Sequence, residues 1–183
     1  FYAEPSECIA LLGPNGVGKT TTMWTIMGAV RLNSGAIWLD NDRIDGLQPH
    51  QTVSKGIAIV PEGRRLYGGM SIEDNLRMGS YQASAKTTES RLQSIFDSFP
   101  LLRERRDQLA GTLSGGQQQL CAIARALMSN PKLLLIDELS LGLSPAAISD
   151  VVEALKTAIN LMKPTVVLVD QDVSIAQQLA TRG

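Results

Sequence analysis

The sequence predicts an α/β fold whose parallel strands are interrupted by an all-helical segment. Four short, fully apolar runs are bounded by turn signals, which is typical of parallel strands covered on both faces. Helical patterns lie between these runs, as expected where strands alternate with helices. The middle of the chain, residues 71–128, carries helix signals but no convincing strand pattern. The 183 residues suffice for one domain with a hydrophobic core.

Each element has a local signal in the sequence. A helix should begin near Lys19 and another at Ser71, where acidic residues follow a capping hydroxyl. Apolar residues between positions 92 and 99 fall on one helical face. The last long helix has Ser144 as its N-cap and Pro145 as its first residue. The strands are expected at residues 9–12, 57–60, 133–136 and 166–169.

These signals predict one domain over residues 1–183. Its core is expected to comprise residues 1–70 and 129–183, with a helical subdomain inserted at about 71–128. The chain starts at Phe1 rather than at a methionine, and it stops just after a helical pattern. We therefore expect a domain that is truncated at both ends.

Composition and charge exclude several classes of protein. The formal net charge of −1 at pH 7 provides no global field that would attract nucleic acid or anionic lipid. No apolar run is long enough to cross a bilayer, so we expect no direct insertion into a membrane. Cys8 and Cys121 lie far apart without metal-ligand spacing, which predicts two buried, reduced thiols in a cytosolic protein.

The residues after the first apolar run match the phosphate-binding pattern G-x-x-x-x-G-K-[ST]. An ordinary Gly-rich turn is the alternative, but the preceding strand and the following helix favour a phosphate site. Lys19 is expected to reach the β- and γ-phosphates of ATP, and Thr20 to ligate Mg²⁺. The predicted nucleotide contacts here are Gly13, Pro14, Asn15, Gly16, Val17, Gly18, Lys19, Thr20 and Thr21.

The third apolar run ends in two carboxylates, Asp137 and Glu138. Asp137 is expected to hold Mg²⁺ through water, and Glu138 to polarise the attacking water as general base. Acidic residues end many strands, so this pair alone is a weak signal. In a chain that also carries a phosphate-binding loop, the pair becomes a strong signal and predicts a P-loop NTPase.

The stretch "LSGGQ" at residues 113–117 is a second helix start that suits an anion. Ser114 as N-cap with Gln117 three residues later forms a capping box. Gly115 and Gly116 allow a phosphate to approach closely. A capped helix without a ligand is the alternative, although capping alone would not need two glycines, which weaken a helix.

With "LSGGQ" ahead of Asp137, the chain resembles the ATP-binding subunits of ABC transporters along essentially its whole length. The resemblance implies a RecA-like core with an ABC-type helical subdomain. It also implies an ATPase that drives a membrane permease from the cytoplasmic face of the inner (plasma) membrane, as a peripheral protein. Four further stretches are similar to the ATPase subunits of branched-chain amino acid importers: "VPEGRR" (60–65), "ERR" (104–106), "SLGL" (140–143) and "LVDQD" (168–172).

In this family, two cassettes meet head to tail around two ATP molecules. The resemblance therefore implies a second ATPase subunit, either identical or different. The signature residues of one subunit would contact the nucleotide held by the other. These residues are Ser114, Gly115, Gly116 and Gln117.

Several positions depart from the family pattern or leave two interpretations open. Glu62 occupies the place of the Q-loop glutamine, which implies contact with nucleotide and Mg²⁺. Gln171 stands where many relatives have a histidine, and it is predicted to donate a neutral N–H to the γ-phosphate. Leu139 replaces the usual proline, so we expect Glu138 to be positioned slightly less well. Arg64 is either solvated or a contact for an acidic permease loop.

The favoured function is an ATPase that powers the uptake of branched-chain amino acids. One alternative is the ATPase of a related amide or urea importer. A second is a soluble ABC ATPase acting on the ribosome or DNA, which the lack of a second cassette or coiled-coil insertion disfavours. A third is a non-hydrolysing interaction module, which the Asp137–Glu138 pair disfavours. The aromatic residue that stacks adenine in relatives is expected to precede Phe1.

Overall fold

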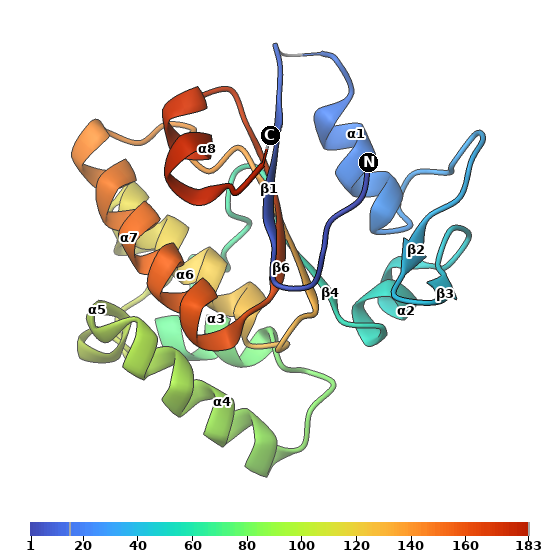
Figure 1. Cartoon of the computed structure of the whole chain (residues 1–183). Helices are drawn as coiled ribbons and strands as arrows, with labels where there is room; N and C mark the ends of the chain where they lie inside the picture. The colour runs from blue at the N-terminus through green and yellow to red at the C-terminus, as the bar shows by residue number, and fades with distance from the viewer. Residues whose placement is uncertain (15, 183) are drawn as a thin grey trace.

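The structure, a computed structural model, describes residues 1–14 and 16–182. Its centre is a parallel four-stranded sheet in the order β1-β6-β5-β4 (Figure 1). Every predicted strand is present, and three of the four extend one or two residues beyond the prediction. The strands are β1 (Cys8–Leu12), β4 (Ile57–Val60), β5 (Leu133–Asp137) and β6 (Thr165–Asp170).

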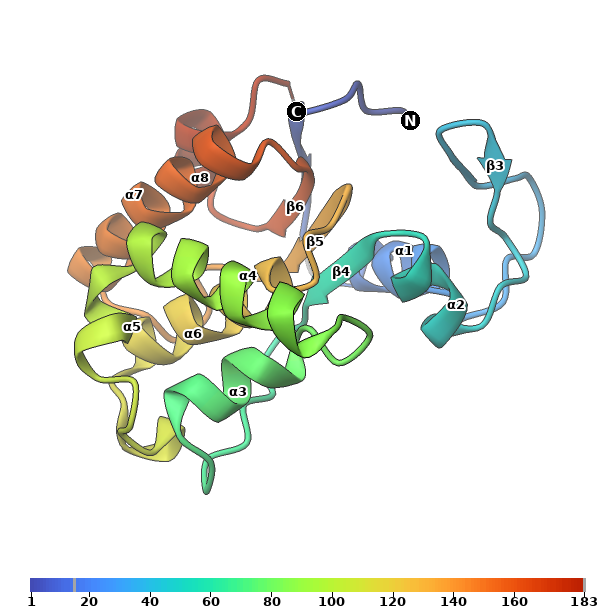
Figure 2. The ribbon, with the colours of Figure 1, turned by 90° about the horizontal axis from the view of Figure 1, so that it is seen from below.

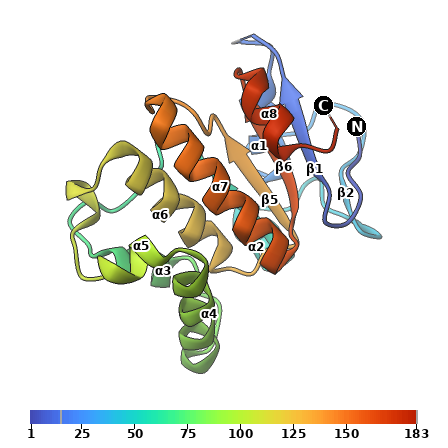
Figure 3. The same ribbon diagram turned by 60° about the vertical axis from the view of Figure 1, so that its left-hand side comes forward.

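Helices cover both faces of this sheet. On one face lie α6 (Gly115–Leu127), α7 (Pro145–Met162) and α8 (Val173–Leu179), which cross in front of the strands in Figure 3. On the other face lie α1 (Lys19–Ile26) and α2 (Pro49–Ser54). Most apolar strand residues are buried because both faces are covered, although Leu12 at the end of β1 is 40% exposed. The predicted α/β class with a parallel sheet is therefore confirmed.

The segment between β4 and β5 is helical, as the sequence predicts. It contains α3 (Ile72–Met78), α4 (Ala85–Ser98), α5 (Pro100–Glu104) and the 3₁₀ turn η1 (Ala110–Thr112). These helices gather with α6 at one end of the molecule, away from the hairpin β2–β3 (Figure 2). The buried apolar residues of α3, α4 and α5 belong to the same core cluster as Ala58 and Val60 of β4 and the buried residues of α7. The division into a core and a separate helical subdomain stays a prediction.

Three predicted helix starts are confirmed by their caps. The hydroxyl of Ser71 accepts a hydrogen bond from the N–H of Asp74, and the hydroxyl of Ser144 accepts one from the N–H of Ala147. Ser114 begins α6 with the predicted capping box. Such caps satisfy N–H groups that have no partner within the helix. The starts at Ser84 (α4) and Asp172 (α8) are capped in the same way but were not predicted.

Other elements were not predicted. The two-stranded antiparallel hairpin of β2 (Trp38–Leu39) and β3 (Asp42–Arg43) is short and mostly exposed, so it lacks a long apolar run. Helix α2 has six residues, too few to show helical periodicity. Among the described residues, no helix combines the length and apolar character needed to cross a bilayer.

Cys8 and Cys121 are buried and unpaired, as predicted. Burial raises the pKa of Cys8 to about 11 and that of Cys121 to about 12, against 9.0 for an ordinary thiol. Unfolded chains therefore lose these protons at lower pH than the folded protein. We predict that the free energy of unfolding falls between pH 9 and 11, by up to about 1.4 kcal/mol per thiol and pH unit.

Urea denaturation at several pH values measures this slope. In Cys121→Ala, the part of the pH slope that the two thiols cause should fall by about half. An unchanged slope in the variant would show that other groups cause the alkaline loss of stability.

Candidate nucleotide-binding site

The loop between β1 and α1 has the conformation of an anion-binding turn. Gly16 and Gly18 have φ values of 83° and 96°, in the left-handed region that other residues rarely adopt. Gly18 is the N-cap of α1 and supplies no capping side chain. The N–H groups of the first turn therefore remain available to a bound anion. The predicted contact Asn15 lies outside the described residues.

The Lys19 side chain folds back onto this loop. The ammonium group of Lys19 donates hydrogen bonds to the carbonyl oxygens of Gly13 at 2.8 Å and Pro14 at 3.0 Å. The positive charge is thus held against the loop. Val17 is mostly exposed, and a methyl group on Gly13 would lie 3.3 Å from its side chain. A larger residue at position 13 would therefore crowd the Val17 side chain within the loop.

Thr21 lies on the exposed side of α1. With Tyr2 and Trp38 it lines a cavity of about 930 Å³. This cavity opens beside the helix that follows the phosphate loop.

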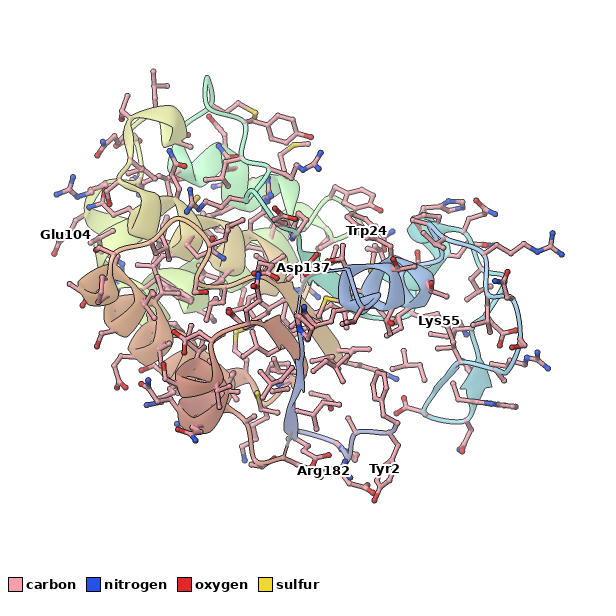
Figure 4. All side chains as sticks on the ribbon, turned by 90° about the horizontal axis from the view of Figure 1, so that it is seen from above. Tyr2, Trp24, Lys55, Glu104, Asp137 and Arg182 are labelled. Atoms are coloured by element: carbon pink, nitrogen blue, oxygen red, sulfur yellow. The ribbon has the colours of Figure 1, made fainter. Side chains whose placement is uncertain are left out.

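Asp137 is the buried centre of the site. It ends β5 and lies beside the start of α1 in Figure 4. One of its oxygens, Oδ1, accepts a hydrogen bond from the hydroxyl of Thr20 at 3.1 Å. The other, Oδ2, is buried without a hydrogen-bond partner among the described residues. A buried acceptor without a partner is costly unless a ligand satisfies it.

The electrostatic surroundings of Asp137 favour a cation. Burial raises the pKa of its carboxyl group, the Thr20 hydroxyl opposes this shift, and the charges of Glu138 and Glu62 raise it further. Glu62 is exposed in the loop after β4. Its charge raises the pKa of Asp137, so the loop lies close to the end of β5. Hydroxyl and carboxylate oxygens are the ligands that Mg²⁺ prefers, together with water and phosphate. The residues present therefore fit a hydrated Mg²⁺ ion.

We predict that Asp137→Asn stabilises the protein in the absence of nucleotide and metal. The neutral amide avoids the cost of burying a charge beside two other carboxylates, which we expect to raise the free energy of unfolding by about 1 kcal/mol. Urea denaturation in EDTA measures this change. Asp107→Asn, at a carboxylate that is 91% exposed, is the control and should leave stability unchanged. A destabilised Asp137→Asn protein would contradict the interpretation.

Glu138 follows β5 in a strained conformation. Its φ of 53° lies in the left-handed region, and its N–H donates to the carbonyl of Val169 at 2.9 Å. Strained backbone of this kind often persists at functional sites, where surrounding contacts hold it. The next residue, Leu139, is almost fully buried in the core. Leu139 thus anchors the turn by packing, and the slightly poorer positioning of Glu138 stays a prediction.

Gln171 makes a direct contact with Glu138. Its side-chain N–H₂ group lies 3.2 Å and 3.1 Å from the two carboxylate oxygens of Glu138. Gln171 therefore provides the predicted N–H donor, and in this structure the acceptor is the carboxylate of Glu138. Contact with a γ-phosphate stays a prediction.

Asp170 was missed by sequence reasoning. It ends β6, is completely buried, and accepts four hydrogen bonds. Its Oδ1 accepts from the Ser140 hydroxyl at 2.9 Å and from the N–H groups of Gln171 and Asp172 at 2.8 Å and 3.0 Å. Its Oδ2 accepts from the N–H of Ser140 at 3.1 Å. One buried carboxylate thus joins the turn that carries Glu138 to the loop that carries Gln171.

The signature "LSGGQ" lies at the start of α6, against other parts of its own chain. A methyl group on Gly116 would come within 3.0 Å of the Ala147 side chain, and one on Gly115 within 3.2 Å of Leu143. Packing within the chain therefore already requires small residues at both positions. Ser114 is exposed, and no hydrogen bond in the described part of the chain joins residues 114–117 to the phosphate loop.

Comparison with known proteins identifies the relatives of this site. Residues 1–140 match the family described as "ABC transporter". The high-affinity branched-chain amino acid transport ATP-binding protein BraG of Pseudomonas aeruginosa is 42% identical over 180 residues, which is 98% of this chain and 77% of that protein. The lipopolysaccharide export system ATP-binding protein LptB of Escherichia coli is 37% identical over 149 residues, covering 79% of this chain and 61% of LptB.

A solved structure supports the same grouping. It is a dimeric ATP-binding cassette in a post-hydrolysis state, bound to ADP and Pi. The two folds superpose with a TM-score of 0.81 over 97% of this chain and 80% of the other, at 25% sequence identity. The predicted P-loop fold of the ABC type is confirmed by this likeness.

Proposed function

Since the chain belongs to the ABC transporter family of ATP-binding proteins, we propose that it powers an importer of branched-chain amino acids. ATP binding and hydrolysis follow from the family itself. The importer role and its cargo are the proposal. The observation that carries them is the 42% identity to BraG over 98% of the chain.

We assign the chemistry to the residues gathered at the ends of β1, β5 and β6. The loop before α1 binds the phosphates of ATP through its N–H groups and Lys19. Glu138 acts as general base on the attacking water. Gln171 holds the Glu138 carboxylate by the contact described above. This support fixes the base close to the phosphate loop.

Mg²⁺ is the metal that we propose for the site. Thr20, Asp137 and, through water, Glu62 would hold it, and the unpartnered Oδ2 of Asp137 supports this assignment. A Mg²⁺ ion held there would supply positive charge to offset the negative charge of the phosphates.

We further propose that the chain acts as one of two ATPase subunits on the cytoplasmic face of the membrane. Ser114 and Gln117 make no hydrogen bond to the described residues of their own phosphate loop, which supports their use by the nucleotide of a second subunit. The permease subunits then provide the membrane passage and determine the cargo.

The uptake experiment tests the cargo. Deleting the gene in its source organism should abolish high-affinity uptake of labelled leucine, isoleucine and valine. The wild-type gene should restore uptake, and the Glu138→Gln variant should not. Normal leucine uptake with lost uptake of urea or short-chain amides would favour the related importers. The likeness to LptB makes a third measurement necessary, the export of lipopolysaccharide.

A further inference from the structure

The loop after β4 contains a run of left-handed backbone. Gly63, Arg64 and Arg65 have φ values of 75°, 64° and 51°. For residues other than glycine, this conformation is costly and persists only where surrounding contacts stabilise it. The two arginines are therefore held in place by something outside the loop.

Arg125 provides this support from helix α6. Its guanidinium group donates hydrogen bonds to the carbonyl oxygens of Arg65 at 2.7 Å and Arg64 at 2.8 Å. Burial lowers the pKa of the Arg125 guanidinium, as expected for a cation removed from water. A half-buried arginine thus fixes the backbone at both strained residues, and with it the direction of the Arg64 side chain.

The Arg64 side chain then connects two other parts of the chain. Its Nε donates to the side-chain oxygen of Gln119 in α6 at 3.1 Å. Its Nη2 donates to the backbone carbonyl of Leu141 at 3.1 Å. Gln119 is buried, with 3% of its surface exposed, so its oxygen depends on this donor. Arg64 is therefore bound to its own domain and is not simply a solvated residue, which corrects one of the two interpretations made from the sequence. Contact with a permease loop stays a prediction.

The contact with Leu141 reaches the catalytic turn. The N–H of Leu141 donates to the carbonyl of Glu138 at 3.4 Å. Arg64 holds the opposite side of the same residue and passes beside Gly115. A methyl group on Gly115 would lie 3.6 Å from Nη2 of Arg64. The loop after β4 is thus linked to the turn after β5 along the start of α6.

We infer that Arg64 is a positioning residue for ATP hydrolysis, which holds the turn of residues 138–143 in register with the loop of residues 61–66. The first turn carries Glu138 and the loop carries Glu62. Neither of these side chains contacts Arg64 in the structure. Arg64 therefore acts through the backbone at Leu141 and not on the nucleotide. This inference depends on the ATPase activity alone and not on the nature of the cargo.

Arg64→Ala removes both contacts and should lower kcat for ATP about tenfold, while KM changes less than twofold. The adjacent Arg65→Ala is the matched control in the absence of a permease. Arg65 has the same left-handed backbone, and its carbonyl still accepts from Arg125 after the substitution. The control should retain the wild-type kcat.

A second-site variant separates positioning from folding. Arg64→Ala leaves the buried oxygen of Gln119 without its donor, which should also lower Tm. Adding Gln119→Leu removes that oxygen and should restore Tm. The double variant should still have a low kcat, because the Leu141 carbonyl remains without its donor. Recovery of kcat together with Tm would show a purely structural role and overturn the inference.

Hydrogen exchange provides a readout that needs no turnover. In Arg64→Ala, the amides of Ser140, Leu141 and Leu143 should exchange about tenfold faster, because the turn that protects them opens more readily. In Arg65→Ala they should exchange at the wild-type rate. Unchanged protection in Arg64→Ala would show that Arg64 does not hold the turn.

Discussion

Replacing Glu138 with glutamine is expected to lower the turnover of ATP by about 10²–10⁴-fold, the range that a general base contributes. Glutamine has nearly the same shape as glutamate but cannot accept a proton from water. Its amide can still contact Gln171, whose N–H₂ group bonds the wild-type carboxylate. Binding of ATP should therefore survive, and the protein should accumulate as an ATP-bound dimer.

Phosphate release under saturating ATP measures this loss, and size-exclusion chromatography with ATP detects the dimer. Glu104→Gln is the control, because Glu104 is exposed at the far edge of the molecule in Figure 4. Hydrolysis at the wild-type rate in Glu138→Gln would remove Glu138 as the base and leave water activation to another group.

Replacing Asp170 with asparagine is expected to damage both stability and activity. The buried carboxylate accepts four hydrogen bonds, from Ser140, Gln171 and Asp172. An amide nitrogen in place of one oxygen faces a donor that it cannot accept from. The free energy of unfolding should fall by about 2 kcal/mol. Turnover should fall about tenfold, because the link between the two loops beside Glu138 is weakened.

A graded series checks this prediction. Ser140→Ala removes only the hydroxyl donor to Asp170 and keeps the N–H bond, so its cost in urea denaturation should be nearer 1 kcal/mol. Asp170→Asn should lower both the free energy of unfolding and kcat more than Ser140→Ala does. Equal effects of the two substitutions would mean that the backbone donors contribute little.

Much of the fold could be predicted because its signals are local. Each strand is a continuous apolar run, and the helix starts at Ser71 and Ser144 carry their capping residues in the adjacent sequence. The phosphate loop and the carboxylate pair after β5 are recognisable for the same reason. Short, exposed elements such as the hairpin of β2 and β3 lack such signals and were missed.

The supporting contacts of the site could not be predicted, because they join residues far apart in the chain. Asp170 bonds Ser140 only because β5 and β6 are neighbours in the sheet, with Asp137 paired to Val169. Arg64 reaches Gln119 and Leu141 only once α6 has packed beside β4. In the sequence, both residues look like ordinary charged residues beside known motifs.

The burial of Leu139 has a consequence for the temperature dependence of the catalytic turn. A proline would restrict the turn by reducing the freedom of the unfolded chain. Leu139 instead secures it by removing apolar surface from water, an interaction with a large heat-capacity change that weakens on cooling. The packing that secures the turn carrying Glu138 is therefore expected to weaken on cooling, whereas the restriction imposed by a proline would not depend on hydrophobic burial.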